Sequence, residues 1–332
     1  MSPRICGSGG GVNPVDVVIP VLDPGRDGKL IRALTMLTQQ TVSPGRIILM
    51  NTEHERYAEW EQRERIAERF PNLLVRQVAR ADFDHAATRN EGASLSDATY
   101  LLFMTMDAVP ADGSLIERLL AVLEEDPSAA VVYARQIPAE DAGPAEQFTR
   151  SFNYPEVSER RVLEDIGRRG IKAFFVSNVC ALYRRSSWDR LGGFSAPAIF
   201  NEDMVFANAA LRAGMSVHYC AEARVIHSHN YTASQQFHRN FDLGVSQAMH
   251  PEVFGRVRSE KEGKRLVSET LRWLKQTGHP EEIPVFLFRC AARYAGYRLG
   301  KSYRLLPRRL VLRCTNHKDY WGFYVRNHRL HR

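Results

Sequence analysis

Apolar and polar segments alternate along residues 15–133 in a way that predicts strands and helices in turn. Short apolar runs such as Val15–Val21 are typical of buried strands, and the segments between them carry apolar residues at helical spacing. The predicted strands cover residues 15–21, 46–50, 73–78, 100–105 and 130–133, and the predicted helices cover residues 28–40, 57–69, 86–96 and 115–124. Strands and helices that alternate at this spacing form right-handed βαβ units. We therefore expect a Rossmann-like α/β fold with a mostly parallel sheet flanked by helices.

The pattern changes after this region. Residues 136–170 are rich in Pro, Glu and Arg and predict an irregular, lid-like insertion. The α/β pattern resumes over residues 173–183, 186–191, 204–213 and 216–220. From Thr232 onward the chain is predicted to be helical, with interruptions near Pro280 and Pro307. These patterns predict a flexible leader at 1–14, an α/β domain at 15–250 and a helical C-terminal region at 251–332.

Polar side chains follow the predicted strands at the points where the strands end. They are Asp23, Asn51, Glu53 and Asp107. Ligands of open α/β sheets bind outside the carboxyl ends of the parallel strands. We therefore expect these four residues to lie where a nucleotide binds.

Neither hydropathy nor cysteine spacing indicates a secreted or membrane-spanning protein. The apolar run at 15–22 is short and interrupted, and no later stretch reaches about 18 uncharged apolar residues. The cysteines are odd in number, scattered and without a CxxC pair: Cys6, Cys180, Cys220, Cys290 and Cys314. This spacing excludes a disulfide framework and a thiolate zinc site, and it fits a reducing compartment. We expect a cytoplasmic location.

The charge is distributed unevenly. Residues 255–332 hold nineteen Lys and Arg against six Asp and Glu, an excess of thirteen, so with a total of +7 the preceding residues carry −6. A basic region on an acidic body suggests a polyanionic partner, either nucleic acid or an anionic membrane surface. No nucleic-acid-binding motif is recognisable, so no nucleic acid partner is expected.

The spacing of the basic residues in this region leaves two interpretations open. Arginine and lysine recur at multiples of about four residues and are interleaved with aromatic and apolar side chains: Arg289, Arg293, Lys301 and Arg308, with Phe286, Leu287, Tyr294, Tyr297 and Leu305. Helices that lie on a membrane surface show this combination. A solvated helical face that covers the α/β domain shows it as well.

An ordered set of short motifs resembles glycosyltransferase family 2. The motifs are Val17–Val21, Thr88–Gly92, Asp107 after a strand, Leu191–Phe194, the pair Glu202 and Asp203, and Val225–His227. Each motif is weak alone, but their order and spacing over roughly residues 15–250 are specific. The resemblance implies a fold of the GT-A type and the transfer of a sugar from a nucleotide donor.

Further strings are similar to those of bacterial rhamnosyltransferases within that family. They are Phe83–Asn90, Thr105–Ala108, Ser151–Pro155, His227–Tyr231 and Arg239–Gly244. This resemblance implies an inverting enzyme of cell-surface polysaccharide synthesis that uses dTDP-L-rhamnose. It also implies a saccharide acceptor linked to a lipid, which would place the protein at the inner leaflet.

The resemblance implies a Mg²⁺ or Mn²⁺ cofactor, and one departure bears on it. Family members commonly carry Asp-x-Asp after the strand, whereas this chain has Asp107-Ala108-Val109. Either Asp107 holds the metal together with a histidine, or the metal dependence is weakened. His227 is the histidine that the family pattern offers, with His229 in reserve on the same face of an extended segment.

The resemblance also implies the other site residues. Asp203 would be the general base with Glu202 as its neighbour, at the start of a helix whose dipole favours the charged form. The donor would be bound by Pro20, Asn51, Glu53, His85, Arg89 and Asp107. Arg89 would contact the diphosphate or support Asp107. A structural alternative stays open for these residues: capping, turn formation or surface ion pairs.

Three other functions compete with this one. The same fold can transfer another hexose from a UDP or GDP donor. The missing second aspartate makes a non-catalytic nucleotide-binding or membrane scaffold protein conceivable. A nucleotidyltransferase would need a glycine-rich phosphate loop after the first strand, and residues 21–25 offer little of that kind.

Overall fold

The computed structural model describes residues 15–25, 27–257 and 259–327. The predicted leader at 1–14 lies outside the described residues. A single sheet has the order β3-β2-β1-β4-β8-β6-β9-β5, with β7 beside β9. The strands are β1 Val15–Val21, β2 Ile47–Asn51, β3 Leu73–Gln77, β4 Tyr100–Met104, β5 Val109–Pro110, β6 Ala129–Ile137, β7 Glu159–Arg161, β8 Cys180–Arg184 and β9 Ser216–Ile226.

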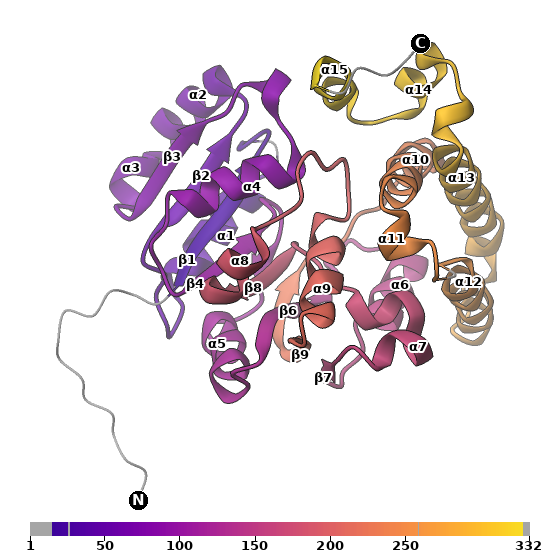
Figure 1. Ribbon diagram of the computed structural model, residues 1–332, viewed down its shortest axis with the longest axis horizontal. Coiled ribbons are helices and arrows are strands. Elements are labelled where there is room, and N and C mark those ends of the chain that lie inside the picture. The colour runs from indigo at the N-terminus through magenta and orange to yellow at the C-terminus, as the bar shows by residue number, and fades with distance from the viewer. Residues whose placement is uncertain (1–14, 26, 258, 328–332) are drawn as a thin grey trace, which may run out of the picture.

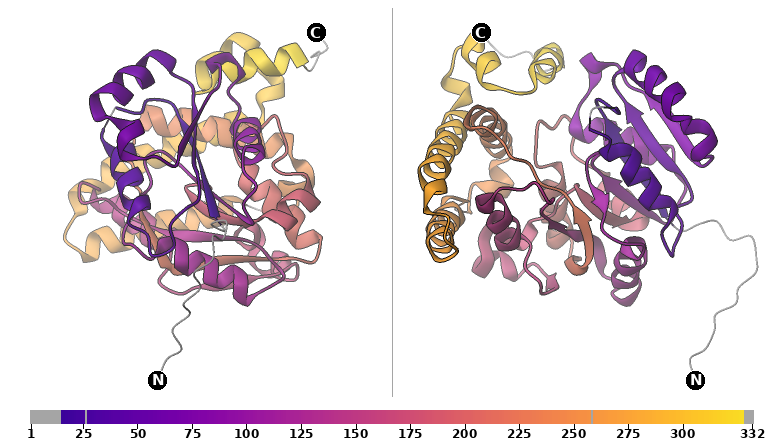
Figure 2. Two further views of the ribbon diagram at one scale, coloured as in Figure 1. Left: turned by 90° about the vertical axis from the view of Figure 1, so that its left-hand side faces the viewer. Right: turned by 180° about the vertical axis from the view of Figure 1, so that it is seen from behind.

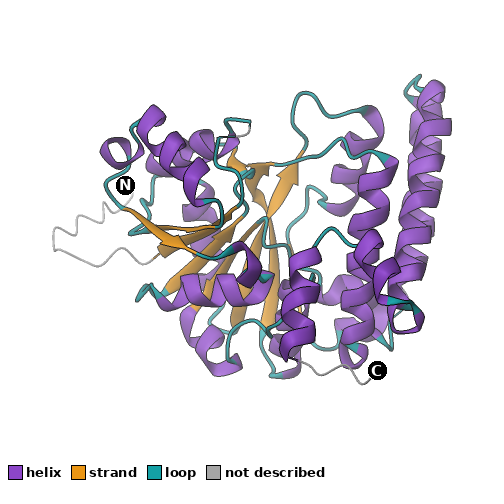
Figure 3. Ribbon diagram, turned by 90° about the horizontal axis from the view of Figure 1, so that it is seen from above, coloured by secondary structure: helices purple, strands orange, loops and turns teal. Residues whose placement is uncertain are grey.

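Helices cover both faces of the sheet (Figure 3). Alternate residues of β1 belong to different cores: Val17 and Ile19 pack with α1, α2 and α5, whereas Val18 packs with α4, α8 and α9. The helices around the sheet are α1 Lys29–Thr38, α2 His54–Glu64, α3 Ile66–Arg69, α4 His85–Ser94, α5 Leu115–Glu125, α8 Arg185–Leu191 and α9 Glu202–Arg212. Because both faces are covered, the central strands are almost continuously apolar, with Asp16 of β1 as an exception.

The expectation of a mostly parallel sheet is confirmed. Strands β3, β2, β1 and β4 pair in parallel, and so do β6 and β9. Strand β8 lies antiparallel between β4 and β6, so β6 and β9 again run in the direction of β4. The carboxyl ends of β1, β2, β4 and β9 therefore meet at one edge of the sheet.

The prediction that residues 136–170 are irregular is wrong. They contain helix α6 Pro144–Asn153, strand β7 and helix α7 Asp165–Arg169. Phe148 of α6 packs on Trp273 of α12, with the ring centroids 5.4 Å apart. Local composition did not reveal this helix because its apolar face is covered by a segment more than a hundred residues later in the chain.

The C-terminal region is helical as predicted, and Figure 1 shows its long helices beside one another, away from β3. The helices are α10 Ala233–Met249, α11 Pro251–Phe254, α12 Ser259–Gln276, α13 Ile283–Lys301, α14 Arg308–Cys314 and α15 Lys318–Asn327. Helices α10 and α13 touch along their backbones, because a Cβ at Gly296 would lie 2.2 Å from the Phe237 carbonyl oxygen. The domain boundary at residue 250 stays a prediction.

After α13 the chain turns back toward the amino-terminal half (Figure 2). Helix α15 contacts the 3-10 helix η1 Arg80–Asp82, which follows β3. Within the described part of the chain, no helix is long and apolar enough to cross a membrane. The described cysteines Cys180, Cys220, Cys290 and Cys314 are free, in agreement with the sequence prediction.

Candidate functional site

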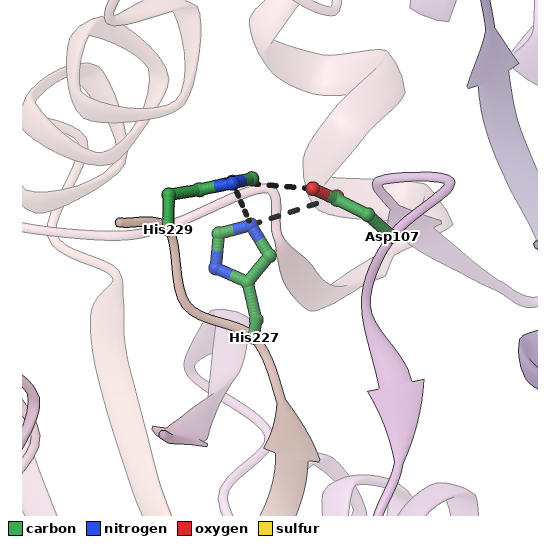
Figure 4. A group of neighbouring side chains, drawn as sticks. All are labelled: Asp107, His227 and His229. Carbon is green, nitrogen blue, oxygen red and sulfur yellow. Dashed lines mark hydrogen bonds and ion pairs between the residues drawn. The ribbon is translucent and has the colours of Figure 1, made fainter. Parts of the chain in front are cut away.

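Asp107, His227 and His229 converge at the edge where β4 and β9 end (Figure 4). The Nε2 atom of His229 lies 3.1 Å from a carboxylate oxygen of Asp107, and the Nε2 atom of His227 lies 3.5 Å from the other oxygen. The two Nε2 atoms are 3.1 Å apart. One ligand atom from each residue lies within 4.8 Å of the others, so the three can share one metal ion.

The protonation states favour metal binding at this cluster. Burial lowers the pKa of His227 to about 4, against the opposing effect of Asp107, so the imidazole is neutral at pH 7. Burial alone would raise the pKa of Asp107, but its contacts with His227 and His229 hold it well below its usual range. The cluster therefore offers one carboxylate and, from His227, a neutral imidazole nitrogen.

Gln136 fixes the orientation of His227. The Nδ1 atom of His227 lies 2.9 Å from the Gln136 Oε1 atom, which also accepts a hydrogen bond from Arg150. The amide nitrogen of Gln136 donates to the hydroxyls of Tyr154 and Ser177. His227 therefore carries its proton on Nδ1, which leaves the Nε2 lone pair on the side of Asp107 and His229, where a metal ion would bind. Sequence reasoning missed Gln136, and no motif marks it.

His229 is held by a stacked aromatic ring. The ring of Tyr231 lies 4.6 Å from that of His229 at an interplanar angle of 22°. The string His227–Tyr231 carried this signal in the sequence, although Tyr231 itself was not predicted as a site residue.

Glu202 forms a buried ion pair at the start of α9. Its carboxylate lies 3.2 Å from the Arg89 guanidinium, and the two side chains are 7% and 5% exposed. The side-chain amide of Asn178 donates a second hydrogen bond to Glu202, at 3.0 Å. Arg89 was predicted near the diphosphate or Asp107, and the structure places it on Glu202 instead. Asn178 was not predicted and lies in no recognised motif.

Asp203 is held differently from its neighbour and stays partly exposed. One carboxylate oxygen accepts a hydrogen bond from the backbone N–H of Asn178 and the other from that of Met204. Burial, together with the charge of Glu202, raises the pKa of Asp203 to about 7. A carboxylate with this pKa can accept a proton near neutral pH.

The predicted donor-binding residues lie along the same edge, on the side of β2. Pro20 and Asn51 are at the carboxyl ends of β1 and β2. The Asn51 amide nitrogen donates to Gln77, while its buried Oδ1 atom has no protein partner. Glu53 pairs with Arg80 at 2.8 Å.

His85, at the start of α4, contacts His317 from the C-terminal region. Their Nε2 atoms are 3.4 Å apart. Sequence reasoning missed His317 because it lies outside every recognised motif. A separate hollow lies next to His229, between α6 and α13, and its lining includes Glu146, Arg289 and Arg293.

Comparison with known proteins supports the motif-based resemblance. Residues 16–192 match the family model described as Glycosyl transferase family 2. The chain is 35% identical over 312 residues to the O-antigen chain rhamnosyltransferase RfbN of Salmonella typhimurium, covering 93% of this chain and 96% of that protein. It is also 35% identical over 288 residues to the O-antigen chain rhamnosyltransferase WbaN of Salmonella anatum, covering 86% and 88%.

Solved structures share the fold. The mannosyltransferase PcManGT of Pyrobaculum calidifontis, in complex with GDP-Man and Mn²⁺, has a TM-score of 0.54 at 16% identity, covering 95% of this chain and 86% of that one. The structure of S. aureus TarS residues 1–349 in complex with UDP-GlcNAc has a TM-score of 0.50 at 13% identity, covering 88% and 91%. These similarities confirm the predicted GT-A type of fold.

The buried ion pair makes a prediction about stability. Arg89→Met leaves the Glu202 carboxylate buried without its cation, so we expect a loss of about 3–5 kcal/mol in the free energy of unfolding. Urea denaturation measures this loss. Arg190→Met, at an exposed arginine of α8, should change it little. A loss for Arg89→Met no larger than that of the control would show that the pair is not a structural link.

Proposed function

The chain belongs to glycosyltransferase family 2, and on this basis we propose that it is a rhamnosyltransferase of cell-surface polysaccharide synthesis. Its donor would be dTDP-L-rhamnose and its acceptor a saccharide, linked to a lipid. The observation that carries the proposal is the meeting of Asp107, His227 and His229 at the sheet edge that also holds Asp203 and the donor-binding residues. Rhamnosyltransferase relatives that match over most of the chain support rhamnose as the transferred sugar.

Asp107, His227 and His229 would hold a Mg²⁺ or Mn²⁺ ion. Three ligand atoms converge within 4.8 Å of one another, and His227 is oriented by Gln136, so the residues fit a dication. Such an ion, when bound, neutralises the charge that develops on the departing diphosphate. The two histidines supply the ligands that the missing second aspartate would give.

Asp203 would act as the general base. Its partly exposed carboxylate takes the proton of the acceptor hydroxyl as the oxygen attacks the anomeric carbon of the sugar. The bond from that carbon to the diphosphate breaks on the opposite side, so the configuration inverts and the nucleoside diphosphate leaves with the bonding electrons. Glu202 would position Asp203, since its own carboxylate is occupied by Arg89 and Asn178.

Pro20, Asn51, Glu53 and His85 would bind the nucleoside part of the donor. The unpartnered Asn51 Oδ1 atom suits a base N–H after a small rotation, and Glu53 suits a ribose hydroxyl. The hollow beside His229 would receive the acceptor, since it adjoins the metal ligands.

The outer face of α13 would bind the inner leaflet of the membrane, which makes the protein cytoplasmic and peripheral. Large apolar side chains are exposed there and just beyond: Val285, Leu287, Phe288, Tyr294, Leu305 and Leu310. Arg298, Arg304, Arg308 and Arg309 are exposed nearby. Apolar and basic groups on one surface fit an anionic bilayer and a lipid-linked acceptor.

Transfer of another hexose from a UDP or GDP donor is the nearest alternative, and the choice of donor can be measured. We expect dTDP-L-rhamnose to raise the melting temperature of the protein more than UDP- or GDP-hexoses do, in the presence of Mn²⁺. Only the rhamnose donor should be turned over when acceptor is supplied. Preferential turnover of a UDP or GDP sugar would reject the rhamnosyl assignment, and binding without any turnover would favour a non-catalytic protein.

The metal site can be tested by nucleotide affinity. Asp107→Ala should abolish the increase in dTDP affinity that Mn²⁺ produces, because the carboxylate is the anionic ligand, and His227→Ala should reduce it. His250→Ala, a histidine outside the cluster, is the control. Calorimetry with and without Mn²⁺ gives the readout. If a chelator leaves the wild-type rate unchanged, the metal assignment is wrong.

The role of Asp203 as the general base predicts that kcat/KM depends on pH. Burial, aided by Glu202, raises the pKa of Asp203 to about 7, and a base works only when ionised. We therefore expect kcat/KM to fall by about tenfold per pH unit below pH 7 and to level off above it. Asp203→Asn should abolish transfer, by about 10²-fold or more, with dTDP affinity near that of the wild type. Substantial transfer by Asp203→Asn would show that another residue is the general base. Asp189→Asn, at an exposed aspartate, is the control and should stay active.

Membrane binding can be tested with vesicles. We expect the protein to sediment with anionic vesicles at low salt, and to be released as ionic strength rises and screens the charges. Phe288→Ser and the pair Arg298→Glu with Arg308→Glu should weaken binding, since each basic residue contributes about 1 kcal/mol. Arg190→Glu, an exposed charge on α8, is the control. Equal sedimentation with neutral vesicles, or none with either kind, would contradict the proposal.

A further inference from the structure

The segment Thr315–Asp319 lies against the predicted donor site, although it is near the C-terminal end of the chain. His317 meets His85, with ring centroids 4.9 Å apart. Asp319 lies 3.5 Å from Arg80, which in turn pairs with Glu53 at 2.8 Å. Figures 1 and 2 show α15, in yellow, beside the amino-terminal half of the molecule. The segment therefore bridges the two halves of the molecule at the edge of the sheet where the donor binds.

Helix α10 holds this segment from the other side. The buried carboxylate of Asp242 accepts hydrogen bonds from the Thr315 hydroxyl at 2.6 Å and from the Asn316 backbone N–H at 2.9 Å. The Nδ1 atom of His238 lies 2.8 Å from the Cys314 carbonyl oxygen. These contacts fix the backbone just before His317, whose own N–H donates to the Thr315 hydroxyl, so the imidazole is positioned without help from a ligand.

Arg239, also on α10, places a positive charge between the Glu202–Asp203 pair and the cluster of Asp107, His227 and His229. Its guanidinium stacks on Phe200, 4.8 Å from the ring centroid, and lies 5.7 Å from that of Tyr231. Phe200 precedes the Glu202–Asp203 pair, and Tyr231 stacks on His229. Among the described residues, no carboxylate lies within ion-pair distance of Arg239, and its side chain is exposed.

The surroundings of His317 favour its neutral form. Burial and the charge of Arg239 together lower the pKa of His317 to about 4, against the effects of Asp319 and Glu202. Burial, His317, Arg89 and Arg239 lower the pKa of His85 well below its usual value. The buried carboxylates nearby are already engaged: Glu202 is paired with Arg89, and Asp242 accepts hydrogen bonds from Thr315 and Asn316. Packing alone does not require two imidazoles and an unpaired guanidinium at one place.

We propose that Thr315–Asp319 forms a wall of the donor site, and that His317 and Arg239 bind the diphosphate of the nucleotide donor. The proposal rests on the proposed function for the presence of a nucleoside diphosphate at this edge. Arg239 offers the charge and the imidazole of His317 offers a hydrogen bond, so both complement the phosphate oxygens left free by the metal ligands. The C-terminal segment then contributes directly to donor affinity.

The test compares dTDP with thymidine by calorimetry, on the full-length chain. His317→Ala and Arg239→Ala should each weaken dTDP binding by about 10- to 100-fold, as expected for loss of a hydrogen bond to a charged group. Thymidine affinity should stay unchanged in both variants, because the nucleoside is bound elsewhere. His317→Gln, which keeps a donor, should recover part of the loss. Lys318→Ala, at an exposed neighbour on the same segment, is the control.

Unfolding curves without ligand show whether each variant folds. Thr315→Val is a second, independent test of whether the segment contributes to dTDP binding. Removing the hydroxyl that anchors the segment to Asp242 should weaken dTDP binding although the His317 side chain itself is unaltered, because the segment no longer holds the imidazole in position. Unchanged dTDP affinity in folded His317→Ala, or an equal loss for thymidine, would overturn the proposal while the transferase function stands. If the wild-type protein binds no nucleoside diphosphate at all, the proposed function itself fails.

Discussion

The meeting of Asp107 with His227 and His229 depends on the direction of two strands that are not neighbours. Strand β4 and strand β9 end at the same edge only because β8 runs antiparallel between β4 and β6, which restores the direction for β6 and β9. Were β8 parallel to its neighbours, the topology would need another crossover helix to bring the same ends together. The proposed metal ligands, the start of α9 and the proposed nucleotide edge are all positioned by this arrangement.

Ion pairing and hydrogen bonding give the adjacent residues Glu202 and Asp203 different environments. Arg89 on α4 and Asn178 before β8 occupy the Glu202 carboxylate, so the first residue of α9 is fixed in the protein interior. Asp203 is then directed outward, where two backbone N–H groups orient it and burial keeps its pKa near neutral. The same principle operates at the metal cluster, where Gln136 orients His227 from behind. In both places a neighbouring side chain sets the geometry of one that we propose to act in catalysis or metal binding.

Much of the fold could be predicted from sequence because the pattern is local. The apolar runs of β1, β2 and β4 and the polar residues after them are adjacent in the chain, so the nucleotide edge follows from periodicity and strand direction. The order of the family motifs located Asp107, Asp203 and His227. The features that could not be predicted depend on contacts between residues far apart in the chain. Helix α6 packs on Trp273 of α12, Arg89 pairs with Glu202, and His85 contacts His317. A single sequence contains no local signal for such pairs.

The account depends most on a metal ion held jointly by this chain and the donor diphosphate. Pulsed electron paramagnetic resonance of the Mn²⁺-loaded protein with dTDP examines that shared coordination directly. The account predicts ¹⁴N couplings from two imidazoles together with ³¹P couplings from the nucleotide, and loss of one nitrogen coupling in His227→Ala. Phosphorus couplings identical to those of free Mn²⁺–dTDP, without any nitrogen coupling, would contradict it.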